Sequence, residues 1–220
     1  SIAAGSVEWW VACLTNTNGG DVLAQRLFND GSLRGGVVGI ETSAEAAEAP
    51  SMGAVGTGAW AVAWRRPGAT GAIRAVQGNG AAVDPTVMTV SSTNTQSSPR
   101  VIGVGSVLNL AYHQAYLGNA VAPILAGTGL GTSTVAPTSY NGDNDIAVAT
   151  LGQTLVVENV PGGDEHLIGL ILGTTTQVSL SLGSTASIDV RLVGTSTGAV
   201  AVMQQHVGIG MTKQTAVIGD

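Results

Sequence analysis

The chain has 220 residues, of which only 10% are charged and 32 are glycine, and its formal net charge is −6. About a quarter of the residues of an average globular protein are charged, so this surface must consist mainly of small and uncharged polar side chains. Lys213 is the only lysine, so there is no basic stripe for the phosphates of nucleic acid. The negative charge also disfavours an anionic membrane surface as a partner.

Cys13 is the only cysteine, so neither an intrachain disulfide nor a cysteine-based metal site can form. The longest apolar stretches, such as residues 167–173, are too short to span a membrane. No signal-peptide pattern opens the sequence, and Ser1 in place of Met fits either processing or a trimmed sequence. A secreted or particle-borne protein of this kind would not depend on disulfides, and we expect an extracellular or particle-surface location.

One order of elements recurs along the chain: a glycine turn, an alternating strand, a polar turn and a second alternating strand. The middle of the second strand of each copy is placed at Trp9, Trp60, Asn109, Thr154 and Ala199, in steps of 51, 49, 45 and 45 residues. The third strand is placed to begin near Val22, Ala72, Ala120, His166 and Ile209, in steps of 50, 48, 46 and 43 residues. The two series shorten together, which predicts an internal repeat.

The repeat predicts a single domain over residues 1–220. Its five units are approximately residues 1–49, 50–98, 99–144, 145–189 and 190–220. In the second unit we expect strands at residues 51–55, 59–64, 72–77 and 83–90. The one helix-like stretch, AEAAEA at 44–49, is too short for a stable helix, and we interpret it as a loop.

Four short antiparallel strands in about 45 residues are typical of one blade of a β-propeller. We therefore predict an all-β, β-propeller-like fold with about five four-stranded antiparallel blades, of which the last is incomplete. A β-sandwich or jelly roll is the alternative, because low charge and abundant small residues also suit a subunit packed among neighbours.

Two stretches resemble bacterial β-propeller-type repeat proteins, WWVACLTNTNGGDVLAQRLFNDGSL at 9–33 and AWAVAWRRPGATGAIRAVQGNGAAV at 59–83. In those proteins an apolar strand that ends in Trp precedes a turn, a strand of the IxAxR kind and an Asp-Gly hairpin. The match is good in the first two units and weak in the last two. The resemblance implies a recognition or scaffold role rather than catalysis, and such a fold does not by itself fix the function.

The turns between the second and third strands should gather on one rim and form a shallow polar bowl. Candidate ligand contacts at this rim are Trp64, Arg65, Arg66, His113, Tyr116, Asp164, Glu165 and His206. Trp64 beside two arginines would suit sugar stacking or a protein contact, whereas packing between blades is the alternative. Trp9 and Trp10, as neighbours on a strand, must point to opposite faces.

The segment NGDNDIA at 141–147 supplies part of the oxygen set of a calcium loop through Asp143 and Asp145. The spacing of an EF-hand is missing, so a turn rich in Asn and Asp is the favoured interpretation. The three histidines, His113, His166 and His206, are scattered along the sequence. We therefore expect no cofactor, with calcium as the alternative.

No nucleophile elbow, phosphate loop, HExxH or dinucleotide fingerprint is present. The leading hypothesis is a non-enzymatic binding or structural module that recognises a glycan or a protein through rim loops. The first alternative is a virion or shell protein that binds copies of itself. A more distant one is a hydrolase that uses Asp164 and Glu165.

Overall fold

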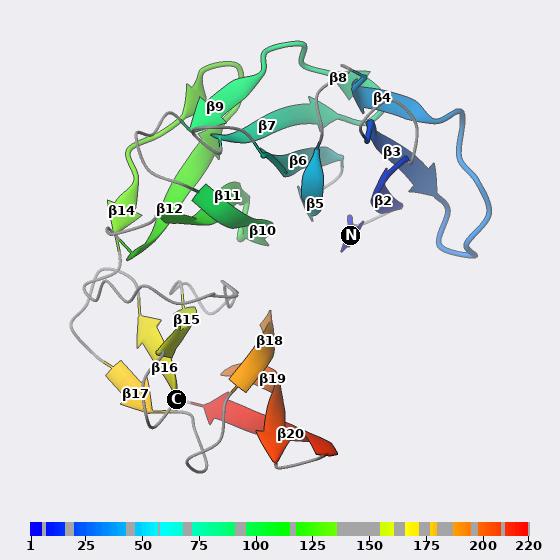
Figure 1. The fold of residues 1–220 in the computed structure, drawn as a ribbon. Coiled ribbons are helices and arrows are strands. Elements are labelled where there is room, and N and C mark those ends of the chain that lie inside the picture. The colour runs from blue at the N-terminus through cyan, green and yellow to red at the C-terminus, as the bar shows by residue number, and fades with distance from the viewer. Residues whose placement is uncertain are drawn as a thin grey trace. The chain divides into compact units, whose positions relative to one another are not determined.

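The computed structural model of the protein is all-β, and the part of the chain it describes contains strands and turns without a helix (Figure 1). It describes residues 1–5, 8–15, 20–42, 47–56, 58–67, 72–90, 96–114, 118–135, 155–160, 166–171, 177–179, 187–194, 198–207 and 210–219. None of these segments forms a helix long and apolar enough to cross a membrane. The predicted all-β class is confirmed.

The first three sheets each contain four or five strands. The first has the order β1 (Ile2–Ala4), β2 (Trp9–Leu14), β3 (Val22–Leu27) and β4 (Val38–Glu41). The second has the order β5 (Glu48–Val55), β6 (Ala59–Arg66), β7 (Ala72–Asn79) and β8 (Ala82–Val83), and β9 (Met88–Val90) also pairs with β7. The third has the order β10 (Gln96–Val104), β11 (Val107–Gln114), β12 (Gly118–Leu125) and β13 (Gly129–Leu130), and β14 (Thr134–Val135) also pairs with β12.

The last two sheets have three strands each within the described residues. One has the order β15 (Leu155–Val160), β16 (His166–Ile171) and β17 (Gln177–Ser179). The other has the order β18 (Ser187–Gly194), β19 (Gly198–Val207) and β20 (Gly210–Gly219). Five sheets thus follow one another along the chain, as the predicted architecture of five units requires.

Contacts divide the chain into two compact units, residues 1–112 with 121–133 and residues 113–120 with 134–220. In the first unit, β5 packs against both β1 and β10. In the second unit, β15 packs against β18. The single domain predicted over residues 1–220 stays a prediction.

The predicted starts of the third strands are confirmed to within two residues. Those strands begin at Val22, Ala72, Gly118, His166 and Gly210. The anchors placed at the middle of the second strands lie instead near their beginnings: Trp9 is the first residue of β2 and Trp60 the second of β6.

The fourth strand of the second unit, predicted as one stretch at 83–90, is split into β8 and β9. Pro85 lies in the gap and has no N–H for a sheet ladder, and Asp84 Oδ1 accepts a hydrogen bond from the Thr86 backbone N at 2.9 Å. In the gap between the two short strands, this local turn takes the place of pairing with β7. In the helix-like stretch 44–49, the strand β5 already begins at Glu48, whereas residues 44–46 lie outside the described residues.

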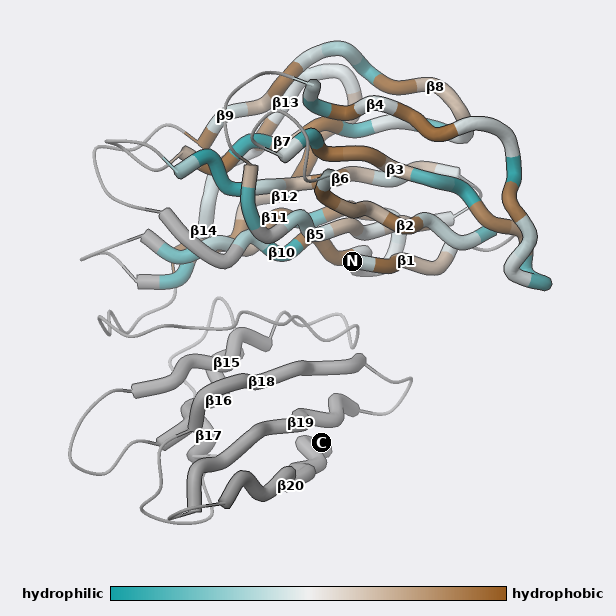
Figure 2. Tube along the Cα trace, turned by 45° about the vertical axis from the view of Figure 1, so that its right-hand side comes forward, coloured by the Kyte–Doolittle hydropathy of each residue, from teal (hydrophilic) through white to brown (hydrophobic). Residues whose placement is uncertain are grey.

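Two indoles form the centre of the core between the first and second sheets. The rings of Trp10 and Trp60 have centroids 4.7 Å apart and are tilted by 37°, and both side chains are almost completely buried. Trp9, the neighbour of Trp10, is 39% exposed, which confirms that the two residues point to opposite faces. Figure 2 shows that β3 begins with a hydrophobic stretch, which a hydrophilic stretch follows.

A hydrogen bond recurs from sheet to sheet along the seam between first strands. Ser1 Oγ accepts from the Met52 backbone N at 3.1 Å, and Ser51 Oγ accepts from the Val101 backbone N at 2.9 Å. Ser1 and Ser51 therefore occupy equivalent positions in successive units. The strands approach so closely that a Cβ built on Gly53 would lie 2.8 Å from Val101.

In the third unit the predicted anchor lies one position further along its strand than in the second unit. Asn109 is the third residue of β11, whereas Trp60 is the second of β6. Three residues separate β5 from β6, but only Gly105 and Ser106 separate β10 from β11. Leu108 and Leu110 are buried, whereas Asn109 is only half-buried.

Candidate ligand-binding site

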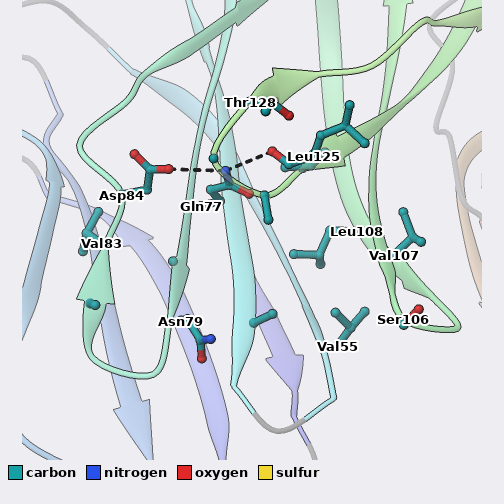
Figure 3. Close-up of a pocket in the computed structure, with 16 residues that line it drawn as sticks. Val55, Gln77, Asn79, Val83, Asp84, Ser106, Val107, Leu108, Leu125 and Thr128 are labelled. Carbon is teal, nitrogen blue, oxygen red and sulfur yellow. Dashed lines mark hydrogen bonds between the residues drawn. The ribbon is translucent and has the colours of Figure 1, made fainter.

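A pocket of about 750 Å³ lies between the second and third sheets (Figure 3). One wall comes from the β5–β6 turn, the end of β7 and the turn after it, and the other from the β10–β11 turn and the end of β12. The pocket therefore lies at the end of the sheets where first strands turn into second strands. The rim predicted from the sequence, formed by the turns between second and third strands, lies at the opposite end of the strands.

The pocket has an apolar lining over most of its surface. Val55 and Val83 come from the second sheet, and Leu108, Ile124 and Leu125 come from the third. Leu108 and Ile124 are buried, while Leu125 is 43% exposed. These side chains give a ligand a surface from which water is readily displaced.

Gln77 connects the two walls. Its Nε2 donates to the Leu125 backbone O at 3.2 Å and to Asp84 Oδ2 at 3.4 Å, as Figure 3 shows. The first bond joins β7 of the second sheet to β12 of the third. Gln77 thus fixes the width of the pocket and keeps an amide oriented within it.

Among the described residues that line this pocket, Asp84 is the only one with a charged side chain. Its backbone N donates to the Gln77 backbone O at 2.9 Å, which fixes the residue beside β7. The hydrogen bond from the Thr86 backbone N, followed by that from the Thr86 hydroxyl, lowers the pKa of Asp84 below its ordinary value of 3.8. The carboxylate is therefore ionised at neutral pH and acts as a hydrogen-bond acceptor.

The glycine turn at the end of β7 forms part of the pocket wall that comes from the second sheet. Gly80 has φ +55°, in the left-handed region that glycine adopts most easily, and lets the chain reverse after Asn79. Trp60 Nε1 donates to the Gly80 backbone O at 2.9 Å. The indole lies so close to Gly78 that a Cβ there would be 2.2 Å from Trp60 Cζ2, so the wall can form only with glycine at position 78.

The remaining polar side chains of the pocket are the amide of Asn79 and the hydroxyls of Ser106 and Thr128. Together with Gln77 and Asp84 they offer both donors and acceptors around an apolar floor. Such a combination suits a ligand that has hydroxyl groups on one side and C–H groups on the other. Among the described residues, no group of three metal-ligating side chains is found.

Three of the residues predicted to contact ligand are buried, and their role as ligand contacts stays a prediction. Trp64 has 0% exposure and packs in the core with Trp10 and Trp60. Arg66 is 7% exposed. His113 is 8% exposed and its Nδ1 lies 3.3 Å from Asn119 Oδ1. Their positions at a strand end suggested exposure, but the neighbouring sheet covers Trp64.

Arg65 is absent from the described lining of the pocket. Arg65 pairs with Glu48 across β5 and β6, with 3.1 Å between Nη1 and Oε2. His206 lies in β19 opposite Met211. Residues outside the described part of the chain are Tyr116, Asp143, Asp145, Asp164 and Glu165.

Sequence reasoning missed the pocket because its residues are spread over turns of two units. The signal that could have found them is the recurrence of short glycine turns at residues 56–58, 78–80, 105–106 and 127–129. The inter-sheet distance that opens the pocket does not follow from such a turn.

Sequence reasoning also missed a buried charged cluster on the first sheet. Glu8, which is 2% exposed, accepts hydrogen bonds from Arg26 at 2.8 Å, Arg34 at 2.8 Å and Trp10 at 3.1 Å. Burial raises the pKa of Glu8, but the bonds and charges of Arg26, Trp10 and Arg34 outweigh it and lower the pKa below 4.5. Trp10 and Arg26 lie on strands of the first sheet and Arg34 lies between β3 and β4, so the cluster is a structural tie within that sheet.

The chain matches no protein-family model, and no curated protein matches it.

Proposed function

We propose that the protein is a non-enzymatic binding module, exposed on a cell or particle surface, that recognises a glycan through the pocket between its second and third sheets. The observation that carries the proposal is the lining of that pocket. Amide, hydroxyl and carboxylate groups lie beside an apolar floor, and one of the amides is fixed by bonds to both walls.

The chemistry of the lining favours a neutral, hydroxyl-rich ligand such as a terminal sugar. Ionised Asp84 accepts hydrogen bonds from hydroxyl groups, and Asn79 can both donate and accept. The C–H face of a sugar ring would lie against Leu108 and Ile124. The part of the lining that the structure describes has a single negative charge and neither arginine nor lysine, which disfavours acidic sugars and phosphates.

The first test is a glycan array probed with the full chain, followed by calorimetric titration of the saccharides it retains. We expect Thr128→Trp, which places an indole in the pocket, to abolish binding. Thr89→Trp is the matched control, because Thr89 is also exposed but lies on β9 outside the pocket. Both variants should keep the wild-type circular dichroism spectrum.

Asp84→Asn separates hydrogen bonding from charge. For a neutral sugar we expect affinity to fall about tenfold, because a charged acceptor forms the stronger hydrogen bond. An unchanged affinity in both Asp84→Asn and Thr128→Trp would contradict the proposed site. Retention of wild-type protein by acidic glycans alone would contradict the ligand class.

A further inference from the structure

One corner of the pocket, which we call the Gln77 corner, consists of the side chains of Gln77 and Asp84 and the Leu125 backbone O. Figure 3 shows these three groups next to one another, joined by the bonds of the Gln77 amide. The Leu125 O accepts from Gln77 Nε2 and from the Thr128 backbone N, each at 3.2 Å. A carbonyl oxygen has two lone pairs, so both are in use and a ligand gains no hydrogen bond from this oxygen.

The chemistry of the two partners fixes the orientation of the Gln77 amide. Its Nε2 lies 3.2 Å from the Leu125 O and 3.4 Å from Asp84 Oδ2, and these two oxygens can only accept. Rotating the amide by a half turn would replace both bonds by contacts between oxygens. Both hydrogens of Nε2 are thus used within the protein, whereas none of the hydrogen bonds among the described residues ends on Oε1. Gln77 can therefore offer a ligand only an acceptor.

Asp84 supplies the second acceptor of the Gln77 corner. Its carboxylate accepts hydrogen bonds from the Thr86 backbone N, the Thr86 hydroxyl and Gln77 Nε2. A carboxylate offers about four lone-pair sites, so about one is left for a ligand. Since Asp84 Oδ2 and Gln77 Oε1 both adjoin the same Nε2, the two remaining acceptors lie side by side.

We infer, resting on the proposed function, that the pocket selects saccharides by two adjacent free hydroxyl groups, one donating to Gln77 Oε1 and the other to Asp84. Gln77 is then the specificity-determining residue of the pocket. Hydroxyls on neighbouring ring carbons can reach two acceptors that flank one amide N–H. An ether oxygen or a fluorine in place of either hydroxyl cannot donate and leaves an acceptor without its partner. The side chains of Asn79 and Ser106 lie toward the other end of the pocket in Figure 3, away from this corner.

Calorimetric titration of the full chain with the methyl glycosides of glucose, galactose and mannose tests the inference. The glycoside that binds best is then compared with its monodeoxy, deoxyfluoro and mono-O-methyl analogues. At two neighbouring ring positions we expect every replacement to lower the affinity about tenfold. The fluoro analogue should lose as much as the deoxy analogue, because fluorine cannot donate. Losses at a single position or only at separated positions, or full affinity of every fluoro analogue, would overturn the inference.

Gln77→Met removes Oε1 and keeps the length of the side chain. We expect the parent glycoside to bind about tenfold more weakly to this variant, and the penalty for removing one of the two hydroxyls to disappear, because its partner atom is gone. A change of pocket width alone would weaken the parent and the deoxy analogue equally, which would contradict a specificity role. Gln25→Met is the matched control, because Gln25 Nε2 donates to the Arg26 backbone O at 2.7 Å on the first sheet, and it should bind like wild type.

Failure of this inference is distinguishable from failure of the proposed function. If no array glycan and no methyl glycoside binds, both are contradicted. If the array retains a glycan but none of the three methyl glycosides binds, this inference alone is contradicted, since each of them carries adjacent free hydroxyls. The same holds if Thr128→Trp abolishes binding but fluorine is tolerated at every ring position.

Discussion

Glu8 is a carboxylate that its partners keep ionised inside the first sheet. Arg26 and Arg34 each approach Oε2 to 2.8 Å, and the Trp10 indole donates to Oε1. Arg26 also lies over the Trp10 ring, 5.4 Å from its centroid. The cluster therefore joins the charge network to the aromatic core, and its strength should depend on pH.

We expect Glu8→Gln to destabilise the protein by about 3 kcal/mol at neutral pH, because it leaves the buried side of Arg26 without a counter-charge. The pKa of Glu8 is lowered in the folded state, so its stabilising contribution is complete above the unfolded-state value near 4.5 and is lost as pH falls toward the folded-state value. The difference between wild type and variant should therefore shrink on acidification. Urea unfolding of both proteins at about pH 7 and about pH 4 measures it, and a difference that stays constant would contradict the assignment.

A substitution at Gly78 tests how closely the Trp60 indole packs against the pocket wall. A Cβ at this position would lie 2.2 Å from Trp60 Cζ2 and 2.4 Å from the Ala82 backbone O, so Gly78→Ala must displace the indole or the β7–β8 turn. We expect a loss of about 2–3 kcal/mol in the free energy of unfolding. Gly36→Ala is the control, since no atom lies within 4 Å of a Cβ there. A Gly78→Ala protein as stable as this control would show that the indole is placed differently.

At the scale of elements, β5 is the strand that joins the first three sheets. It packs against β1 on one side and β10 on the other, and small residues make the second approach close. A Cβ on Gly103 of β10 would lie 2.7 Å from the Ala54 backbone O. The seam between first strands is therefore held by backbone proximity and by the recurring serine bonds.

Ser51→Ala should cost about 1–3 kcal/mol, because it leaves the Val101 backbone N buried without its acceptor. Ser32→Ala is the matched control: its hydroxyl bonds Asp30 on an exposed turn, and surface substitutions of this kind stay within about 0.5 kcal/mol. Thermal unfolding of the two variants side by side checks the expectation. Equal stabilities would mean that the serine bonds do not hold the seam.

Strand positions could be predicted because alternation and glycine turns are local. Val22, Ala72 and His166 each begin a strand where the sequence places one. Burial in a strand that is covered on both faces could not be predicted in the same way. Trp64 packs in the core with Trp10, as the alternative of packing between blades requires, but nothing in its own strand shows that the first sheet covers it.

For the whole molecule, the sequence predicts the class and number of units, and the structure shows five sheets in chain order. The pocket depends on how far apart two of those sheets are held, which is set by Gln77 and by glycine contacts between segments about 50 residues apart. The residues of one strand or turn alone do not determine such a distance between two sheets. The rim residues predicted from the sequence lie at the other end of the strands from this pocket in the second unit, and their role stays a prediction.

The central claim is that the pocket between the second and third sheets binds a glycan. The most direct measurement is a backbone-amide chemical-shift map of the full chain, titrated with the saccharide that the array retains. We predict that the largest changes fall on Gln77, Asp84, Ser106 and Thr128, and that Thr128→Trp removes them. Changes concentrated instead at Arg65 and His113, or an array that retains no saccharide, would contradict the claim.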